Sequence, residues 1–196
     1  MTRQKFLTVG HSTHDGETFA RLLLGHGVTA VADVRSTPFS RFTPQFNRRA
    51  LARDLPPRGI SYVFLGDELG ARPSDPGCYV DGKVQYARLA ATEQFTRGIQ
   101  RLARGATSER IAIMCAEGEP LDCHRTVLVS RVLVEGGAAV QHLHGDGSLE
   151  SHADAMLRLM GKFGLADDDL FRTHDERLNE ALKRQEERIA HVGSAP

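Results

Sequence analysis

Nucleophilic and ionisable side chains are concentrated in one short segment of the chain. It reads Cys115-Ala116-Glu117, then Pro120, then Cys123-His124-Arg125. An apolar run precedes it and a helical pattern follows it, so the sequence predicts a strand, a turn and a helix that begins near Asp122 or Cys123. The free N–H groups of such a helix terminus favour a phosphate or a carboxylate, and the segment therefore predicts an anion site.

The residue types in this segment also suit catalysis. A cysteine in the first turn of a helix, beside His124 and Arg125, is expected to have a lowered pKa, because the helix dipole and the cations stabilise the thiolate. Either cysteine could then act as a nucleophile, while glutamate and histidine supply acid–base chemistry. The predicted catalytic residues are Cys115, Cys123, Glu117, His11 and His124.

Polar residues also follow the other apolar runs of the sequence. In an open α/β sheet, ligands bind outside the carboxyl ends of the strands, so these residues should meet at one edge. The predicted ligand-binding residues are Ser12, Asp33, Arg35, Ser40, Arg125 and His142.

Simpler interpretations stay open for several of these residues. Cys115 could be an inert buried thiol, and Asp33 and Arg35 could form an ion pair at a strand end. Cys115, Cys123 and His124 are metal-ligating types, but their spacing matches no standard zinc pattern and no fourth ligand is evident, so no metal site is predicted. The sequence does not identify a cofactor.

Alternating strand and helix patterns must position these residues. Apolar runs predict strands at 5–9, 28–34, 60–65, 111–115 and 139–143, and helical spacing predicts helices at 16–26, within 44–55, and at 86–104, 123–135 and 149–163. Residues 66–83, rich in Gly, Pro and Asp, predict a long surface loop. The alternation predicts a single three-layer α/β/α domain over residues 5–163 with a mainly parallel five-stranded sheet.

The chain changes character after residue 163. Residues 166–190 are highly charged, with a narrow apolar stripe of Leu178, Leu182 and Ile189. This predicts a charged C-terminal helix within residues 164–196, docked on the domain or on a second copy of the chain, and dispensable for the site.

Several stretches resemble one protein family, DUF488, whose bacterial and archaeal members are named only as a domain of unknown function. The most specific is C-A-E-x-x-P-x-x-C-H-R at 115–125, and others are Thr8-Val9-Gly10-His11-Ser12 and Asp33-Val34-Arg35. The similarity spans about residues 5–163, with Ala71 where the family often has glycine. The resemblance implies an α/β fold and supplies no activity.

Composition narrows the classes of function. Lys+Arg and Asp+Glu are both 25, so the zero net charge gives no support for a nucleic-acid partner, although the cluster Arg41, Arg48, Arg49, Arg53 and Arg58 keeps that alternative open. The absence of a long apolar run excludes a transmembrane helix, and three cysteines are typical of a reduced, cytoplasmic protein.

The sequence favours an enzyme that acts on a small phosphorylated or nucleotide-like molecule. The alternatives are a non-catalytic module that binds a ligand or nucleic acid, and a thiol redox or sulfur-transfer protein. The predicted partners are the small anionic ligand and a second copy of the chain, with no membrane.

Overall fold

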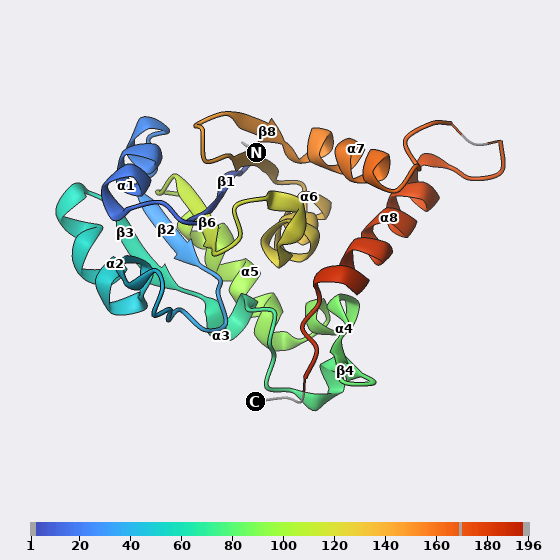
Figure 1. Cartoon of the computed structure of the whole chain (residues 1–196), viewed down its shortest axis with the longest axis horizontal. Coiled ribbons are helices and arrows are strands. Elements are labelled where there is room, and N and C mark those ends of the chain that lie inside the picture. The colour runs from blue at the N-terminus through green and yellow to red at the C-terminus, as the bar shows by residue number, and fades with distance from the viewer. Residues whose placement is uncertain (1–2, 169, 194–196) are drawn as a thin grey trace.

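A twisted, mainly parallel sheet forms the centre of the computed structural model, which describes residues 3–168 and 170–193 (Figure 1). The strand order is β3-β2-β6-β1-β7-β8. The strands are β1 Lys5–Gly10, β2 Ala30–Asp33, β3 Ser61–Phe64, β6 Ile111–Cys115, β7 Ala139–Leu143 and β8 Leu149–Ser151. All neighbours pair in parallel except β8, which runs antiparallel to β7. The predicted α/β class is confirmed, with six strands rather than five.

Helices cover both faces of the sheet, as the apolar strands require. The helices in the described part of the chain are α1 Gly16–Gly25, α2 Arg48–Asp54, α3 Gly66–Leu69, α4 Tyr86–Ala90, α5 Glu93–Gly105, α6 Arg131–Glu135, α7 His152–Lys162 and α8 His174–Ile189. Shorter turns are η1 Pro44–Phe46, η2 Pro56–Arg58, η3 Pro76–Cys78, η4 Pro120–Asp122 and η5 Arg125–Ser130, the last with π-helical hydrogen bonding.

Alternate side chains of β6 divide the core into two layers. Ala112 and Met114 pack with α1 and α2 on one face. Ile111, Ile113 and Cys115 pack on the other face with α5, η5, α7 and α8. The sulfur of Cys115 is thereby placed on the same side of the sheet as η5 and the C-terminal helix.

The sequence analysis did not predict two hairpins. Leu149–Ser151 was expected to begin a helix but forms β8, joined to β7 by a turn in which Gly147 has φ +89°. The predicted surface loop 66–83 contains α3 and a hairpin of β4 Tyr79–Val80 and β5 Lys83–Val84, whose turn residues Asp81 and Gly82 both have positive φ. Each turn contains an Asp-Gly pair, which readily adopts the left-handed backbone of a tight hairpin.

Two further predicted helices differ from the expectation in their bounds. The helix expected over 86–104 divides into α4 and α5, because the Thr92 side chain accepts the Phe95 N–H and begins a new helix. The helix expected within 44–55 is confirmed as α2, which η1 precedes. The helix expected from Asp122 or Cys123 begins one residue later, since Cys123 has an extended backbone with φ −136° and ψ 140°.

The charged C-terminal helix docks on the domain as predicted. Thr173 and Glu176 form a capping box at the start of α8. Leu182 is buried, and Leu178 and Ile189 pack partly buried against the core. Among the described residues, none of the helices is both long and apolar enough to cross a bilayer.

Candidate functional site

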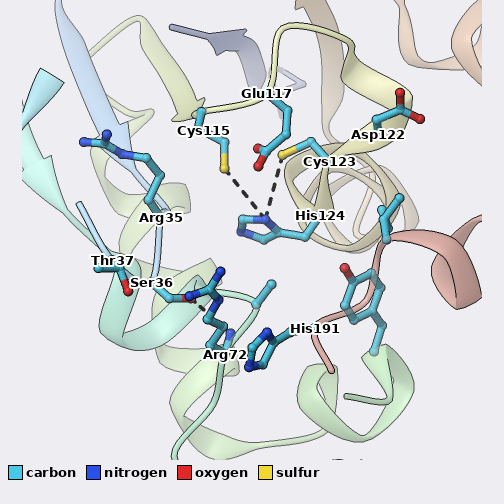
Figure 2. Close-up of a pocket in the computed structure, with 14 residues that line it drawn as sticks. Arg35, Ser36, Thr37, Arg72, Cys115, Glu117, Asp122, Cys123, His124 and His191 are labelled. Atoms are coloured by element: carbon cyan, nitrogen blue, oxygen red, sulfur yellow. Dashed lines mark hydrogen bonds between the residues drawn. The ribbon is translucent and has the colours of Figure 1, made fainter. Parts of the chain in front are cut away.

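A cavity of about 300 Å³ opens beyond the carboxyl ends of β2 and β6 (Figure 2). Parallel pairing of these two strands brings their ends together, as expected for ligand sites in open α/β sheets. The cavity is lined by Arg35, Ser36, Thr37, Ala71, Arg72, Tyr86, Cys115, Ala116, Glu117, Asp122, Cys123, His124, Ile189 and His191. Four of the five predicted catalytic residues therefore share one wall.

Two sulfur atoms face one histidine ring at the inner end of this cavity. His124 Nδ1 lies 3.8 Å from Cys115 Sγ and 3.8 Å from Cys123 Sγ. On its other side, His124 Nε2 lies 3.1 Å from the Val34 carbonyl oxygen. A carbonyl oxygen only accepts hydrogen bonds, so Nε2 carries a proton and Nδ1 is the nitrogen available to the sulfurs. All three residues are buried.

The local charges distinguish the two thiols. Burial opposes ionisation of Cys123, but the Cys115 thiol, Arg125 and His124 outweigh it and bring the pKa of Cys123 well below its usual range. The hydrogen bond to Cys123 and burial together raise the pKa of Cys115. Burial resists protonation of His124, yet the adjacent Cys123 raises the pKa of the ring. Negative charge in the cluster is thus favoured on Cys123, with Cys115 as its hydrogen-bond donor.

The Glu117 carboxylate turns toward the two sulfur atoms from the loop after β6 (Figure 2). Glu117 is exposed as a residue, but partial loss of hydration at its carboxylate raises the pKa, and the negative charge of Cys123 raises it further. A carboxyl group with a raised pKa beside nucleophilic sulfurs is suited to accept or donate a proton during a reaction.

The loop that carries Glu117 is held by backbone contacts. Arg125 is completely buried, and its NH1 and NH2 groups donate to the carbonyl oxygens of Glu117 and Gly118 at 2.6 and 3.2 Å. The strand end at Gly10 lies so close to this loop that a Cβ there would meet the Glu117 carbonyl oxygen at 1.8 Å. Arg125 therefore shapes the loop and does not line the cavity, in contrast to its predicted role in ligand binding.

Arg35 was expected to bind a ligand anion, but its guanidinium is engaged within the protein. It forms a bidentate pair with Asp33, with Nε–Oδ1 and NH2–Oδ2 distances of 2.9 and 2.7 Å. Its NH1 donates to His11 Nε2 at 3.1 Å, because His11 Nδ1 carries the proton that is donated to the Ser12 carbonyl oxygen. Burial lowers the pKa of His11 to about 4. Arg35 borders the cavity, whereas Asp33 and His11 lie behind it.

Three other predicted ligand residues lie outside the cavity. Ser12 has φ +48° and donates its backbone N–H to the Ala116 carbonyl oxygen, so it supports the loop after β6. The Ser40 hydroxyl accepts the N–H groups of Phe42 and Thr43 and organises a separate turn. His142 is buried in β7 against Thr8.

The family model described as "Domain of unknown function DUF488" matches residues 15–132, which is more than half of the chain. This chain belongs to the DUF488 family. No curated protein and no solved structure matches it. The matched region of this DUF488 protein includes Cys115, Glu117, Cys123 and His124, whereas the cavity residues Ile189 and His191 lie beyond it.

The C-terminal segment of this DUF488 protein is part of the site, which corrects the expectation that it is dispensable. Ile189 and His191 line the cavity. Gln185 of α8 donates to the Leu121 carbonyl oxygen at 2.8 Å, and the Tyr86 N–H donates to the Glu186 carboxylate at 2.6 Å. These contacts tie α8 to two segments of the cavity wall, and the narrow apolar stripe gave no indication of them.

Sequence reasoning also missed Ser36, Thr37, Arg72 and Tyr86 as cavity residues. Arg72 reaches into the cavity from the side opposite the sulfurs (Figure 2). Its backbone N–H donates to the Ser36 hydroxyl at 3.0 Å, and its guanidinium has no ion pair to any residue in 3–168 or 170–193. The only sequence signal for Arg72 was its position after a strand and a short glycine-bounded turn.

The buried His142–His152 pair predicts a dependence of stability on pH. His142 Nε2 lies 3.1 Å from His152 Nδ1. Burial is the main cause that lowers the pKa of His142 to about 3. His152 and Arg125 also lower this pKa, and Glu150 offsets the effect only in part. Burial lowers the pKa of His152 to about 4. Since the unfolded chain binds these protons near pH 6.5, the stabilising contribution is complete above about pH 6.5 and is lost as the pH falls toward about 4.

We therefore expect the free energy of unfolding to fall between about pH 6.5 and about pH 4, by up to about 1.4 kcal/mol per pH unit for each histidine. Urea titrations across this range measure the slope. His152→Gln should reduce it, whereas His174→Gln, at the exposed start of α8, should leave it unchanged. An identical slope in wild type and His152→Gln would contradict the prediction.

Proposed function

We propose that this protein is an enzyme that acts on a small phosphorylated or nucleotide-like molecule bound in the cavity beyond β2 and β6. The observation that carries the proposal is the convergence of Cys115, Cys123, His124 and Glu117 on one cavity wall. Nucleophilic sulfur, imidazole and a carboxyl group of raised pKa in one polar cavity are typical of a catalytic site.

We propose that Arg72 binds the anion. Arg35 and Arg125 are engaged by internal partners. The N–H of Arg125, at the start of the helix, points to Cys123 Sγ at 3.4 Å, so this sulfur occupies part of the expected anion site. Arg72 is exposed at the cavity and has no ion pair among the described residues, which leaves its guanidinium available for a phosphate or carboxylate.

The size of the cavity limits the substrate. A volume of about 300 Å³ is at the lower end of small-molecule sites. Such a space suits a compact phosphorylated molecule or one part of a nucleotide. The ring of the buried Tyr86 is also part of the cavity lining.

A screen of nucleotides and sugar phosphates by thermal shift tests this assignment, since a ligand of the folded state raises the melting temperature. For a compound that binds, Arg72→Ala should weaken the affinity by about 10- to 100-fold, the value of a charge-assisted hydrogen bond. The matched control is Arg49→Ala, at an exposed position on α2 away from the cavity lining. Equal affinity of wild type and Arg72→Ala for every anion, or no anion bound at all, would overturn the assignment.

The closeness of the two sulfurs favours thiol redox or sulfur transfer as a second candidate. Cys115 and Cys123 place their sulfur atoms within 4.8 Å of each other. We rank this candidate second because it leaves Glu117 and the unpaired Arg72 without a role.

A further inference from the structure

We propose that Cys115, Cys123 and His124 bind one zinc ion at the inner end of the cavity. The ligand atoms would be the two Sγ atoms and His124 Nδ1, which all lie within 4.8 Å of one another. This departs from the expectation drawn from sequence spacing, because β6 and the start of η5 bring together residues that no standard zinc pattern places in this order. The zinc site adds a metal to the proposed enzyme site. Only the use of the ion in catalysis rests on the proposed function.

Two of the three separations lie close to those of a tetrahedral site, and the two sulfurs lie within 4.8 Å of each other. Zn–S bonds of about 2.3 Å and Zn–N bonds of about 2.0 Å place neighbouring ligand atoms about 3.5–3.8 Å apart. Both sulfur-to-Nδ1 distances are 3.8 Å. The Arg125 backbone N lies closer to Cys123 Sγ, at 3.4 Å, than His124 Nδ1 does.

The surroundings orient each ligand as metal sites require. His124 Nε2 donates to the Val34 carbonyl oxygen, which fixes the tautomer and turns the Nδ1 lone pair toward both sulfurs. The Arg125 backbone N–H donates to Cys123 Sγ, and such a contact stabilises a thiolate ligand. Cys115 is held at the end of a central strand, paired in register with Gly10 of β1. Three preset ligands lower the cost of ordering the site when the ion binds.

The ligand set also selects the metal and its role. Two thiolates and one imidazole suit zinc better than magnesium or calcium, which prefer oxygen ligands. Three protein ligands leave a fourth coordination position, as in catalytic rather than structural zinc sites. All three ligand residues line the cavity, so this position faces the space assigned to the substrate, with the Glu117 carboxylate beside it (Figure 2).

Metal analysis of the full-length protein tests the proposal. Protein purified from zinc-supplemented cells, or reconstituted with zinc after chelation, should hold about one ion per chain by plasma mass spectrometry. Cobalt substitution should give an intense near-ultraviolet band from thiolate-to-cobalt charge transfer. Cys115→Ser and Cys123→Ser should each lose the band and most of the zinc, whereas Cys78→Ser, which alters the third buried cysteine outside the cluster, should retain both.

Circular dichroism of each variant separates loss of the ion from loss of the fold, and His124→Gln provides a ligand change that leaves both cysteines in place. Wild-type protein that holds no zinc after reconstitution would overturn the proposal, as would zinc content that Cys78→Ser lowers as much as Cys123→Ser does. Anion binding that depends on Arg72 in zinc-free protein would then leave the proposed function standing with free thiols. Zinc binding without any anion binding would support the metal site and overturn the proposed function.

Discussion

Asp33→Ala should destabilise the protein by about 3–5 kcal/mol, because it leaves the buried charge of Arg35 without its counter-charge. Asp33 has no exposed surface, and Arg35 is 6% exposed. Asp33 Oδ2 accepts hydrogen bonds from Arg35 NH2 and from the Tyr62 hydroxyl, both at 2.7 Å. The substitution leaves the Arg35 and Tyr62 donors without this carboxylate acceptor.

Urea denaturation at neutral pH measures this effect as a lower free energy of unfolding. If Asp33→Ala does not fold, the double variant Asp33→Ala/Arg35→Met keeps the prediction testable, since removal of both charges should recover much of the loss. Asp54→Ala breaks the exposed Arg53–Asp54 pair and should cause no measurable change. An Asp33→Ala variant as stable as Asp54→Ala would contradict the buried-pair explanation.

The strand ends and the residues that follow them were predictable from sequence. Apolar runs located β1, β2, β3, β6 and β7, and the rule for open α/β sheets then located the site at their carboxyl edge. The segment from Cys115 to Arg125 was the richest in ionisable and nucleophilic side chains, and Cys115, Glu117, Cys123 and His124 from it line the cavity. The strands could be predicted because runs of apolar residues, and the positions where these runs end, are local properties of the sequence.

The roles of the arginines were not predictable in the same way. Arg35 and Arg125 follow strands and carry the right charge, yet internal acceptors engage both guanidinium groups. Arg72, which remains available, lies in a segment read as an ordinary surface loop. Whether an arginine binds a ligand depends on which acceptors the fold brings near it, and sequence spacing does not contain that information.

The contribution of the C-terminal helix to the cavity could not be predicted for the same reason. The stripe of Leu178, Leu182 and Ile189 correctly predicted docking. It did not predict the site of docking, which depends on contacts such as Gln185 to Leu121, 64 residues apart in the chain. A long-range polar contact of this kind has no periodic signature.

We propose that the Glu117 side of the cavity carries out proton transfer on a bound anion. The Glu117 carboxylate faces the two sulfurs, so Glu117→Gln should remove proton transfer by this group while preserving the shape of the site. Glu119→Gln is the matched control, because Glu119 lies two residues further on, outside the cavity, where its carboxylate accepts the Leu121 N–H.

The most direct measurement is the rate at which wild type, Glu117→Gln and Glu119→Gln consume compounds that bind in the anion screen, followed by mass spectrometry. Glu117→Gln should turn over about 10²- to 10⁴-fold more slowly than wild type, the usual contribution of general acid–base catalysis, while Glu119→Gln remains near wild type. A bound compound that wild type never converts, or one that Glu117→Gln converts as fast as wild type, would contradict the assignment of this cavity as an active site.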